Sequence, residues 1–350
     1  MNKKQLIKIS LLVGGVVFSH AVSAQNGVAE LAQVGPDATK LANAYLSPIF
    51  KGFGIGLNSG WTNSAHSKNL GRFDLRVGVT GAIVPQKDEM FDVTGLGLSN
   101  SVRLKAGQST LSPTAAGDKT NGPIVEIYNG SNKVKEFNLP QGANIPLIPA
   151  PQLQATVGLI KGIDVSLRAI PEIKMGDVGS INMLGGGVKV ELLPLIAGKT
   201  AGKLLPFDLA LALGYTQFSY NKNLDYDSPD GVAVEDNQKI EAKISGLNTQ
   251  MILSKKLLVF TPFIALGYNT SKTSGGLKGD YRVITGSVPI TNMPVYSTIT
   301  DPVSLDKKNF NSFRSDIGFQ LNLAVIRFYA SYSASEYNSF NAGIGLGIGK

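Results

Sequence analysis

The chain has 350 residues, of which 43% are hydrophobic and only 17% are charged, and it contains 40 glycines and no cysteine. Ordinary soluble domains have about 25% charged residues and about 7% glycine, so this composition argues against a disordered chain, a coiled coil or a helical bundle. The lack of cysteine excludes disulfide scaffolds, thiolate metal sites, cysteine nucleophiles and lipid attachment at an N-terminal cysteine.

Residues 1–24 have the pattern of a secretory signal peptide. Lys3, Lys4 and Lys8 precede an apolar run over residues 9–18, and Ala-Val-Ser-Ala follows at 21–24. The run is well short of the ~20 residues that a membrane-spanning helix needs, so we expect cleavage after Ala24. The remaining chain has 30 basic and 25 acidic residues, a net charge of +5, and no basic block of the kind that binds nucleic acid.

Alternating segments dominate the rest of the chain. In 207–216 one face carries large apolar side chains and the other carries small or polar ones, and the same split recurs in 73–79, 163–168 and 316–325. With an export signal, this pattern favours an outer-membrane barrel, because only a closed barrel satisfies every backbone polar group of a sheet in lipid. Aromatic residues near strand ends, such as Trp61, fit interfacial girdles. A secreted soluble β-sandwich or barrel is the alternative.

Twelve strands are predicted in chain order: 52–62, 72–84, 90–103, 151–160, 163–171, 181–193, 207–220, 239–253, 258–271, 313–324, 327–335 and 338–349. The weak strand at 90–103 is included because single-chain bacterial barrels have an even number of strands. A further pair within 275–305 would raise the count to fourteen. The prediction is an all-β fold, a transmembrane antiparallel β-barrel of 12 to 14 strands over residues 52–350.

Connection lengths assign the two ends of this barrel. Tight connections at Lys161-Gly162, Lys255-Lys256 and Val325-Ile326 are assigned to the periplasm, where outer-membrane barrels have short turns. The longer connections then lie outside, with large external loops at 104–150 and 272–312. Loop 104–150 carries its own predicted hairpin, turning at Asn129-Gly130.

Residues 25–51 are predicted to hold a short N-terminal helix, with Asp37 as its N-cap and Pro48 at its end. Closure of the barrel would pair the first strand with the last and join two rows of inward glycines. This glycine seam comprises Gly52, Gly54, Gly56, Gly343, Gly345 and Gly347. Because interior glycine marks a bend or the close approach of another backbone, we expect the helix to enter the lumen as a plug. Strand curvature with a loosely attached periplasmic helix is the alternative.

Charged residues predicted on the inner face carry both signs, and we expect most of them to be paired wall groups that line the lumen. They are Asp74, Arg76, Asp164, Arg168, Lys189, Glu191, Asp208, Lys239, Glu241, Lys243 and Asp316.

Five segments resemble an uncharacterised family of Gram-negative outer-membrane barrel proteins with a domain of unknown function. They lie at 44–77, 151–173, 181–194, 205–217 and 333–349, and the block from Asn58 to Trp61 is the most specific part. A more distant similarity, in GPDATKLANAYLSP at 35–48 before a glycine-rich segment, is to the long-chain fatty-acid outer-membrane transporters with an N-terminal hatch. The second resemblance implies fourteen strands and transport.

Residue types for catalysis and metal binding are scarce. Once His20 leaves with the signal peptide, His66 is the only histidine, and it lies in a polar loop beside Ser64 and Ser67 without an assignable carboxylate partner. The acidic stretches 224–231 and 234–238 lack the glycine and terminal glutamate of a calcium hand. We therefore predict no enzyme activity, no cofactor and no metal.

The leading functional prediction is a barrel in the cell outer membrane that passes or binds a small hydrophobic or amphipathic solute through a partly plugged lumen. The first alternative is a structural or recognition barrel whose external loops bind a partner, and the second is a lipid-modifying outer-membrane enzyme. Expected partners are outer-membrane lipid and lipopolysaccharide, a small hydrophobic solute, and the barrel-assembly machinery during insertion.

Overall fold

The computed structural model describes residues 34, 37–160, 162–196, 205–228, 230–232, 234–235, 237–288, 291 and 293–348. The predicted signal peptide at 1–24 and residues 25–33 of the N-terminal segment lie outside the described residues.

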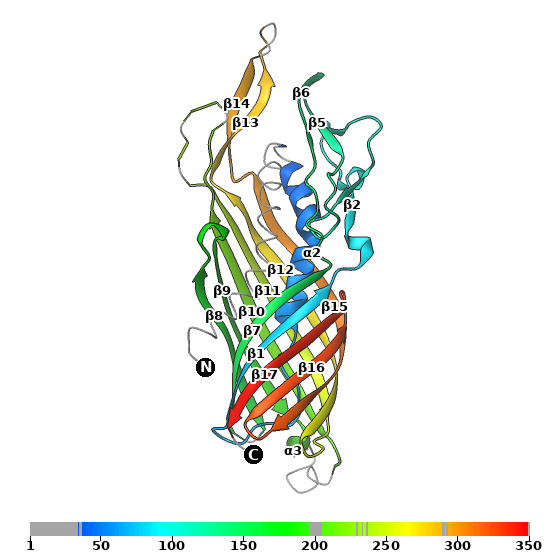
Figure 1. Ribbon diagram of the computed structural model, residues 1–350, viewed down its shortest axis with the longest axis vertical. Coiled ribbons are helices and arrows are strands. Elements are labelled where there is room, and N and C mark those ends of the chain that lie inside the picture. The colour runs from blue at the N-terminus through cyan, green and yellow to red at the C-terminus, as the bar shows by residue number, and fades with distance from the viewer. Residues whose placement is uncertain are drawn as a thin grey trace.

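Ten antiparallel strands close into a barrel within this part of the chain (Figure 1). They are β1 Phe73–Ile83, β7 Leu147–Gly158, β8 Ile163–Lys174, β9 Ser180–Glu191, β10 Asp208–Asn223, β11 Lys239–Ser254, β12 Phe260–Lys278, β15 Val303–Leu323, β16 Ile326–Ala334 and β17 Ser339–Ile348. β1 pairs with β17 on one side and with β7 on the other, so each barrel strand has two neighbours.

The period-2 pattern of the sequence becomes the two faces of the wall. In β10, Leu211, Leu213 and Tyr215 are exposed, whereas Ala210, Ala212 and Thr216, at positions of the other parity, are buried. Every barrel strand contributes at least one large exposed apolar side chain to the outer face: Leu75, Leu153, Leu167, Val188, Leu213, Met251, Ile264, Ile317, Phe328 and Ile344. The result is a continuous apolar belt around the barrel.

The prediction of twelve barrel strands is wrong at two segments. Residues 52–58 belong to a helix, α2 Ala38–Asn58, which runs through the predicted stop at Pro48. Segment 90–103 contains only β2 Met90–Asp92, the 3-10 turn η3 Thr94–Leu96 and the start of β3 Val102–Leu104, none of which joins the barrel. The pair expected within 275–305 is β13 Asp280–Ser287 and β14 Pro294–Thr300, which form a two-stranded sheet of their own.

Connections of different length lie at opposite ends of the barrel. One end, which we call the short-turn end, holds the connections 159–162, 255–259 and 324–325. It also holds the longer connection 192–207, which carries α3 Leu193–Ile196. The long-loop end holds 84–146, 224–238 and 279–302, together with the shorter 175–179, which carries η4 Gly176–Val178, and 335–338. The predicted loops 104–150 and 272–312 have different bounds, because β7 starts at Leu147, β12 reaches Lys278 and β15 starts at Val303.

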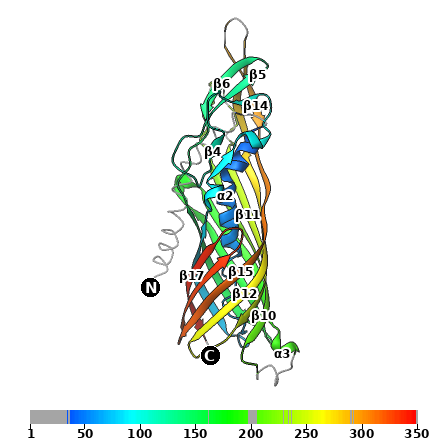
Figure 2. The same ribbon diagram turned by 90° about the vertical axis from the view of Figure 1, so that its right-hand side faces the viewer.

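Loop 84–146 folds into small sheets of its own beyond the rim of the barrel (Figure 2). It carries η2 Gln86–Asp88, β2 paired with β4 Leu111–Pro113, and β3 paired with the hairpin β5 Ile124–Asn129 and β6 Asn132–Asn138. Gly130, at the predicted turn, has a φ of 63°, a value that favours glycine.

Helix α2 lies inside the barrel, entering from the long-loop end (Figures 1 and 2). It packs against β1, β7, β10, β11, β12 and β15. Residues 52–58 are buried without exception, and a helix that is buried on every side is enclosed by its surroundings. Among the described residues, no helix combines the length and the apolar character needed to cross a membrane.

Candidate functional site

The filled lumen is the candidate site, and glycine sets how closely α2 meets the wall. Gly52 and Gly56 lie four residues apart on one helix face, against Ile148 and Ala150 of β7. A Cβ atom at Gly52 would lie 2.5 Å from Ile148 Cδ1, closer than side chains tolerate. Gly54 faces the opposite wall, where β12 and β15 approach it. Glycine therefore lets the backbone of α2 pack closely against β7 on one side and against β12 and β15 on the other.

The glycine seam predicted between the first and last strands does not exist. Gly52, Gly54 and Gly56 are helical, and β17, with Gly343, Gly345 and Gly347, pairs instead with β1 and β16. A glycine at every second position fits a strand face, but it also places glycine on two opposite faces of a helix. The second pattern is the one that the enclosed helix uses.

Inward side chains of the wall hold the C-terminal end of α2. Arg168 of β8 donates to the carbonyl oxygens of Leu57 at 2.9 Å and Ser59 at 3.1 Å. Gln152 and Gln154 of β7 donate to the carbonyls of Gly56 and Trp61. The last carbonyls of a helix lack partners within the helix and carry partial negative charge, so these donors satisfy them.

Two more arginines complete this arginine cluster, which we define as Arg76, Arg168 and Arg314. Arg76 of β1 donates to the carbonyl of Gly60, and Arg314 of β15 donates to the hydroxyl of Ser59 at 3.0 Å. Arg314 also pairs with Asp316 at 2.7 Å. Arg76 and Arg168 have no carboxylate within 4 Å among the described residues; both donate instead to the amide oxygen of Gln154 and to backbone carbonyls at the helix end.

The upper part of α2 is attached to the long-loop end. Asp37 accepts hydrogen bonds from the backbone and hydroxyl of Ser99, and these bonds together with Lys40 outweigh the effect of burial and lower the pKa of Asp37. Tyr45 donates to the carbonyl of Gln141 at 2.8 Å. Further down, Phe53 packs on Phe218 with ring centroids 4.5 Å apart. The half of the lumen toward the long-loop end therefore combines apolar contacts of this kind with buried polar groups, since Asn309 donates to the hydroxyls of Ser271 and Thr273.

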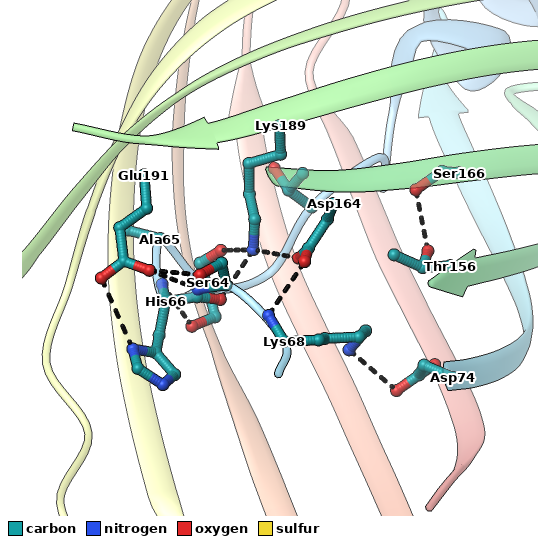
Figure 3. Close-up of polar contacts among 12 residues, drawn as sticks. Ser64, Ala65, His66, Lys68, Asp74, Thr156, Asp164, Ser166, Lys189 and Glu191 are labelled. Atoms are coloured by element: carbon teal, nitrogen blue, oxygen red, sulfur yellow. Dashed lines mark hydrogen bonds and ion pairs between the residues drawn. The ribbon is translucent and has the colours of Figure 1, made fainter. Parts of the chain in front are cut away.

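Connection 59–72, between α2 and β1, is held to the wall at the short-turn end (Figure 3). Lys189 of β9 donates to the carbonyls of Ser64 and His66 and pairs with Asp164 of β8 at 3.0 Å. Asp164 also accepts a hydrogen bond from the backbone of Lys68 at 2.9 Å. The ion pair between two strands thus also fixes the connection.

His66 lies between two carboxylates at the same end. Its Nδ1 atom is 3.5 Å from Asp208 Oδ1 and 3.7 Å from Glu191 Oε1. The interactions with Asp208 and then Glu191 outweigh burial and raise the pKa of His66 to about 9. The side chain is still 54% exposed, so one face of the ring meets solvent.

The structure separates the predicted lumen residues into two groups. The buried members face α2, connection 59–72 or one another, with Asp208 at the short-turn rim: Asp74, Arg76, Asp164, Arg168, Lys189, Glu191 and Asp316. The prediction was wrong for Lys239, Glu241 and Lys243. In β11 the buried positions are Ala242, Ile244, Asn248 and Gln250, so the odd-numbered charges lie on the outer face, near the long-loop end.

Several lumen residues were missed. Arg314 has the same parity as Asp316, and this spacing is a signal that would have found it. Trp61, expected in an interfacial girdle, is 4% exposed inside the lumen. Gln152 and Gln154 are uncharged, so the search for inward charged residues did not find them. They bind the end of α2, about 95 residues earlier in the chain, and no pattern within β7 predicts that contact.

Comparisons with known proteins add a family. No curated protein matches the chain. Solved structures with similarity include the attachment invasion locus protein Ail of Yersinia pestis, at 8% identity over 80% of this chain and 100% of that chain with a TM-score of 0.25. The outer membrane protease OmpT from Escherichia coli matches at 10% identity over 79% of this chain and 97% of its own, with a TM-score of 0.30.

A family model covers residues 1–348, nearly the whole sequence. The chain therefore belongs to the family of unknown function DUF6588.

Proposed function

We propose that this protein is an outer-membrane barrel that α2 keeps closed at rest, and that its long loops act at the cell surface. The observation that carries the proposal is the apolar belt combined with a buried helix in the lumen. Water-soluble monomers rarely expose apolar patches beyond a few hundred Å². A belt that includes all ten strands suits acyl chains, and the closed ladder leaves no strand edge in lipid.

The contacts of α2 support a closed resting state. Its lower half is enclosed by the wall, and the arginine cluster binds the backbone and the Ser59 hydroxyl where the helix ends. Its upper half is bonded to loop 84–146 through Asp37 and Tyr45. Helix α2 and loop 84–146 are thus joined by hydrogen bonds, so α2 supports the loop as well as filling the lumen. This arrangement favours a barrel whose loops serve in recognition or in a structural role.

Fractionation and conductance test this proposal. We expect the protein in the outer-membrane fraction, with loop 224–238 open to protease on intact cells and the short-turn end protected. The purified full chain in planar bilayers should give no steady conductance. Recovery of the protein in the soluble periplasmic fraction would refute the membrane location, and a steady current would refute the closed lumen.

Passage of a small amphipathic solute is the second candidate, and a specific observation favours it. Four buried polar atoms near the end of α2 have no hydrogen-bond partner among the described residues: Asn58 Oδ1, Trp61 Nε1, Asn248 Oδ1 and Asn269 Nδ2. Asn248 and Asn269 are paired positions of β11 and β12. Buried polar atoms usually have hydrogen-bond partners, so these four atoms could bind a polar group at low cost.

Uptake into liposomes separates the two candidates. Solute passage requires α2 to move, so substitutions that push the helix from the wall should raise uptake of an amphipathic solute above that of the native chain. If the native chain and the substituted variants both show only the uptake of protein-free liposomes, recognition by the loops remains as the function.

We also propose that the protein is not an enzyme. The Ser64 hydroxyl accepts a hydrogen bond from the backbone of His66, and the imidazole faces carboxylates. No serine is hydrogen-bonded to this imidazole in the described part of the chain, whereas a Ser-His hydrolase needs that contact. Lipase assays with purified protein should give no signal.

A further inference from the structure

Three side chains from three elements meet at the short-turn end of the barrel. His66 lies in connection 59–72, Glu191 is the last residue of β9, and Asp208 is the first residue of β10. One nitrogen and two carboxylate oxygens from these residues lie within 4.8 Å of one another. The distances from Nδ1, 3.5 Å and 3.7 Å, are close to those between ligands that share one ion, because ligands bound at about 2.1 Å in tetrahedral geometry lie about 3.4 Å apart.

The carboxylate of Glu191 is oriented in advance. Glu191 is 6% exposed, and its Oε2 atom accepts hydrogen bonds from both the backbone and the hydroxyl of Ser67. The other oxygen, Oε1, is directed at His66 (Figure 3) and accepts no hydrogen bond shorter than 3.5 Å from a described residue. Metal-binding carboxylates are held by outer hydrogen bonds of this kind.

The position of His66 is fixed in the same way. Lys189 donates to the backbone carbonyl of His66 at 2.7 Å. The backbone N–H of the preceding residue, Ala65, donates to the Ser254 hydroxyl at 2.9 Å. The ring is still half exposed, so a small ion can reach Nδ1 from the aqueous side.

The charge around the group favours a cation. Glu191 and Asp208 have no lysine or arginine within 4 Å among the described residues, and Lys189, which belongs to the same strand as Glu191, is paired with Asp164. A divalent ion bound beside His66 Nδ1 would balance the charge of both carboxylates.

We propose that His66, Glu191 and Asp208 bind one divalent transition-metal ion of the Zn²⁺ type at the short-turn end. An imidazole nitrogen with two carboxylates suits zinc and its neighbours, whereas Mg²⁺ and Ca²⁺ prefer oxygen ligands alone. The ion joins connection 59–72 to β9 and β10 and so fixes the lower end of the segment that continues from α2. This site is independent of the proposed surface function.

The test uses the untagged full chain, folded in detergent and stripped of metal with a chelator. Titration with Zn²⁺ should show one ion per chain and a rise in the unfolding temperature, and Co²⁺ should give visible d–d absorption. His66→Ala and Asp208→Asn should abolish both signals. Ser67→Ala removes one outer hydrogen bond and should weaken Zn²⁺ binding about tenfold. Asp306→Asn, an exposed carboxylate beside Lys272 at the long-loop end, should bind as the native chain does.

Three results would overturn the proposal. These are failure of the native chain to bind Zn²⁺, binding of Zn²⁺ by His66→Ala with unchanged affinity and stoichiometry, and competition by Mg²⁺ equal to that of Zn²⁺. If His66→Ala does not fold, as judged by heat-modifiable migration in gels, the comparison of Asp208→Asn and Ser67→Ala with Asp306→Asn decides the question.

Discussion

Arg168 stacks on Trp61, with its guanidinium carbon 4.0 Å from the centroid of the ring. The arginine is fully buried in the wall, and the tryptophan follows α2 by three residues. The same guanidinium donates to the carbonyls of Leu57 and Ser59. One wall residue therefore closes the helix end and packs the segment that leaves it.

Arg168→Gln should destabilise the barrel by about 2–3 kcal/mol, because it removes charged hydrogen bonds and leaves carbonyl oxygens buried without a donor. Arg168→Lys should cost less, since an ammonium keeps the charge but cannot reach both carbonyls with one planar fork. Urea unfolding in detergent, followed by tryptophan fluorescence at Trp61, measures both. Equal loss in the two variants would show that the retained charge contributes nothing and that the planar fork carries the whole effect.

Gly56→Val should loosen α2 from the wall, since a side chain at this position meets Ala150 of β7. Inserting methyl groups into a packed interior costs about 1–3 kcal/mol. We expect a lower unfolding temperature and, in planar bilayers, intermittent conductance that the native chain lacks. Gly186→Ala is the matched control, because a Cβ atom at this wall glycine has no neighbour within 4 Å. Conductance of both variants alike would argue against the plug.

The ten wall strands were predictable because each carries its pattern locally. Alternation in 207–216 or 316–325 gives the strand, its faces and its inward residues such as Asp316 without knowledge of any partner. Parity errors arise where the pattern weakens near a rim, as at Lys239–Lys243, because beyond the apolar belt both faces of a strand accept polar residues. The outward apolar positions Leu247, Met251 and Leu253 of the same strand carry the right parity.

The lumen was less predictable, because its contacts join distant parts of the chain. Gly52, Gly54 and Gly56 fit a strand as well as a helix, and the choice depends on walls that lie about 100 residues away or more, at Ile148 and Ser271. His66 likewise meets Glu191 and Asp208 only because connection 59–72 continues from α2 to the short-turn end, beside the ends of β9 and β10. A single sequence holds no record of that course.

Acid should loosen the contact of α2 with the long-loop end through Asp88. Its Oδ2 atom accepts hydrogen bonds from Tyr337 at 2.6 Å and Lys51 at 2.9 Å. Burial alone would raise the pKa of Asp88, but these bonds outweigh it and lower the pKa below its usual value. A carboxyl with a depressed pKa in the folded state stabilises the fold above its unfolded pKa of about 3.9, and this contribution is lost as pH falls through the folded value.

Urea midpoints at pH 7 and pH 3 test this dependence. Asp88→Asn should be less stable than the native chain at pH 7, and the difference should shrink at pH 3. Asp306→Asn provides the control, since this carboxylate is mostly exposed. A difference that stays constant with pH would assign the effect of Asp88→Asn to packing rather than to charge.

Leu211→Arg distinguishes a lipid-facing belt from an ordinary exposed surface. Leu211 lies between Phe207 and Tyr215 on the outer face of β10 and is 42% exposed. In water, arginine at an exposed position costs almost nothing, whereas at the middle of a bilayer it costs about 2–4 kcal/mol. Gln217→Arg, on the same face but beyond Tyr215, should cost about 0–1 kcal/mol, as expected near the interface. Folding into lipid vesicles at increasing urea measures both, and equal costs would place β10 in water rather than in the membrane.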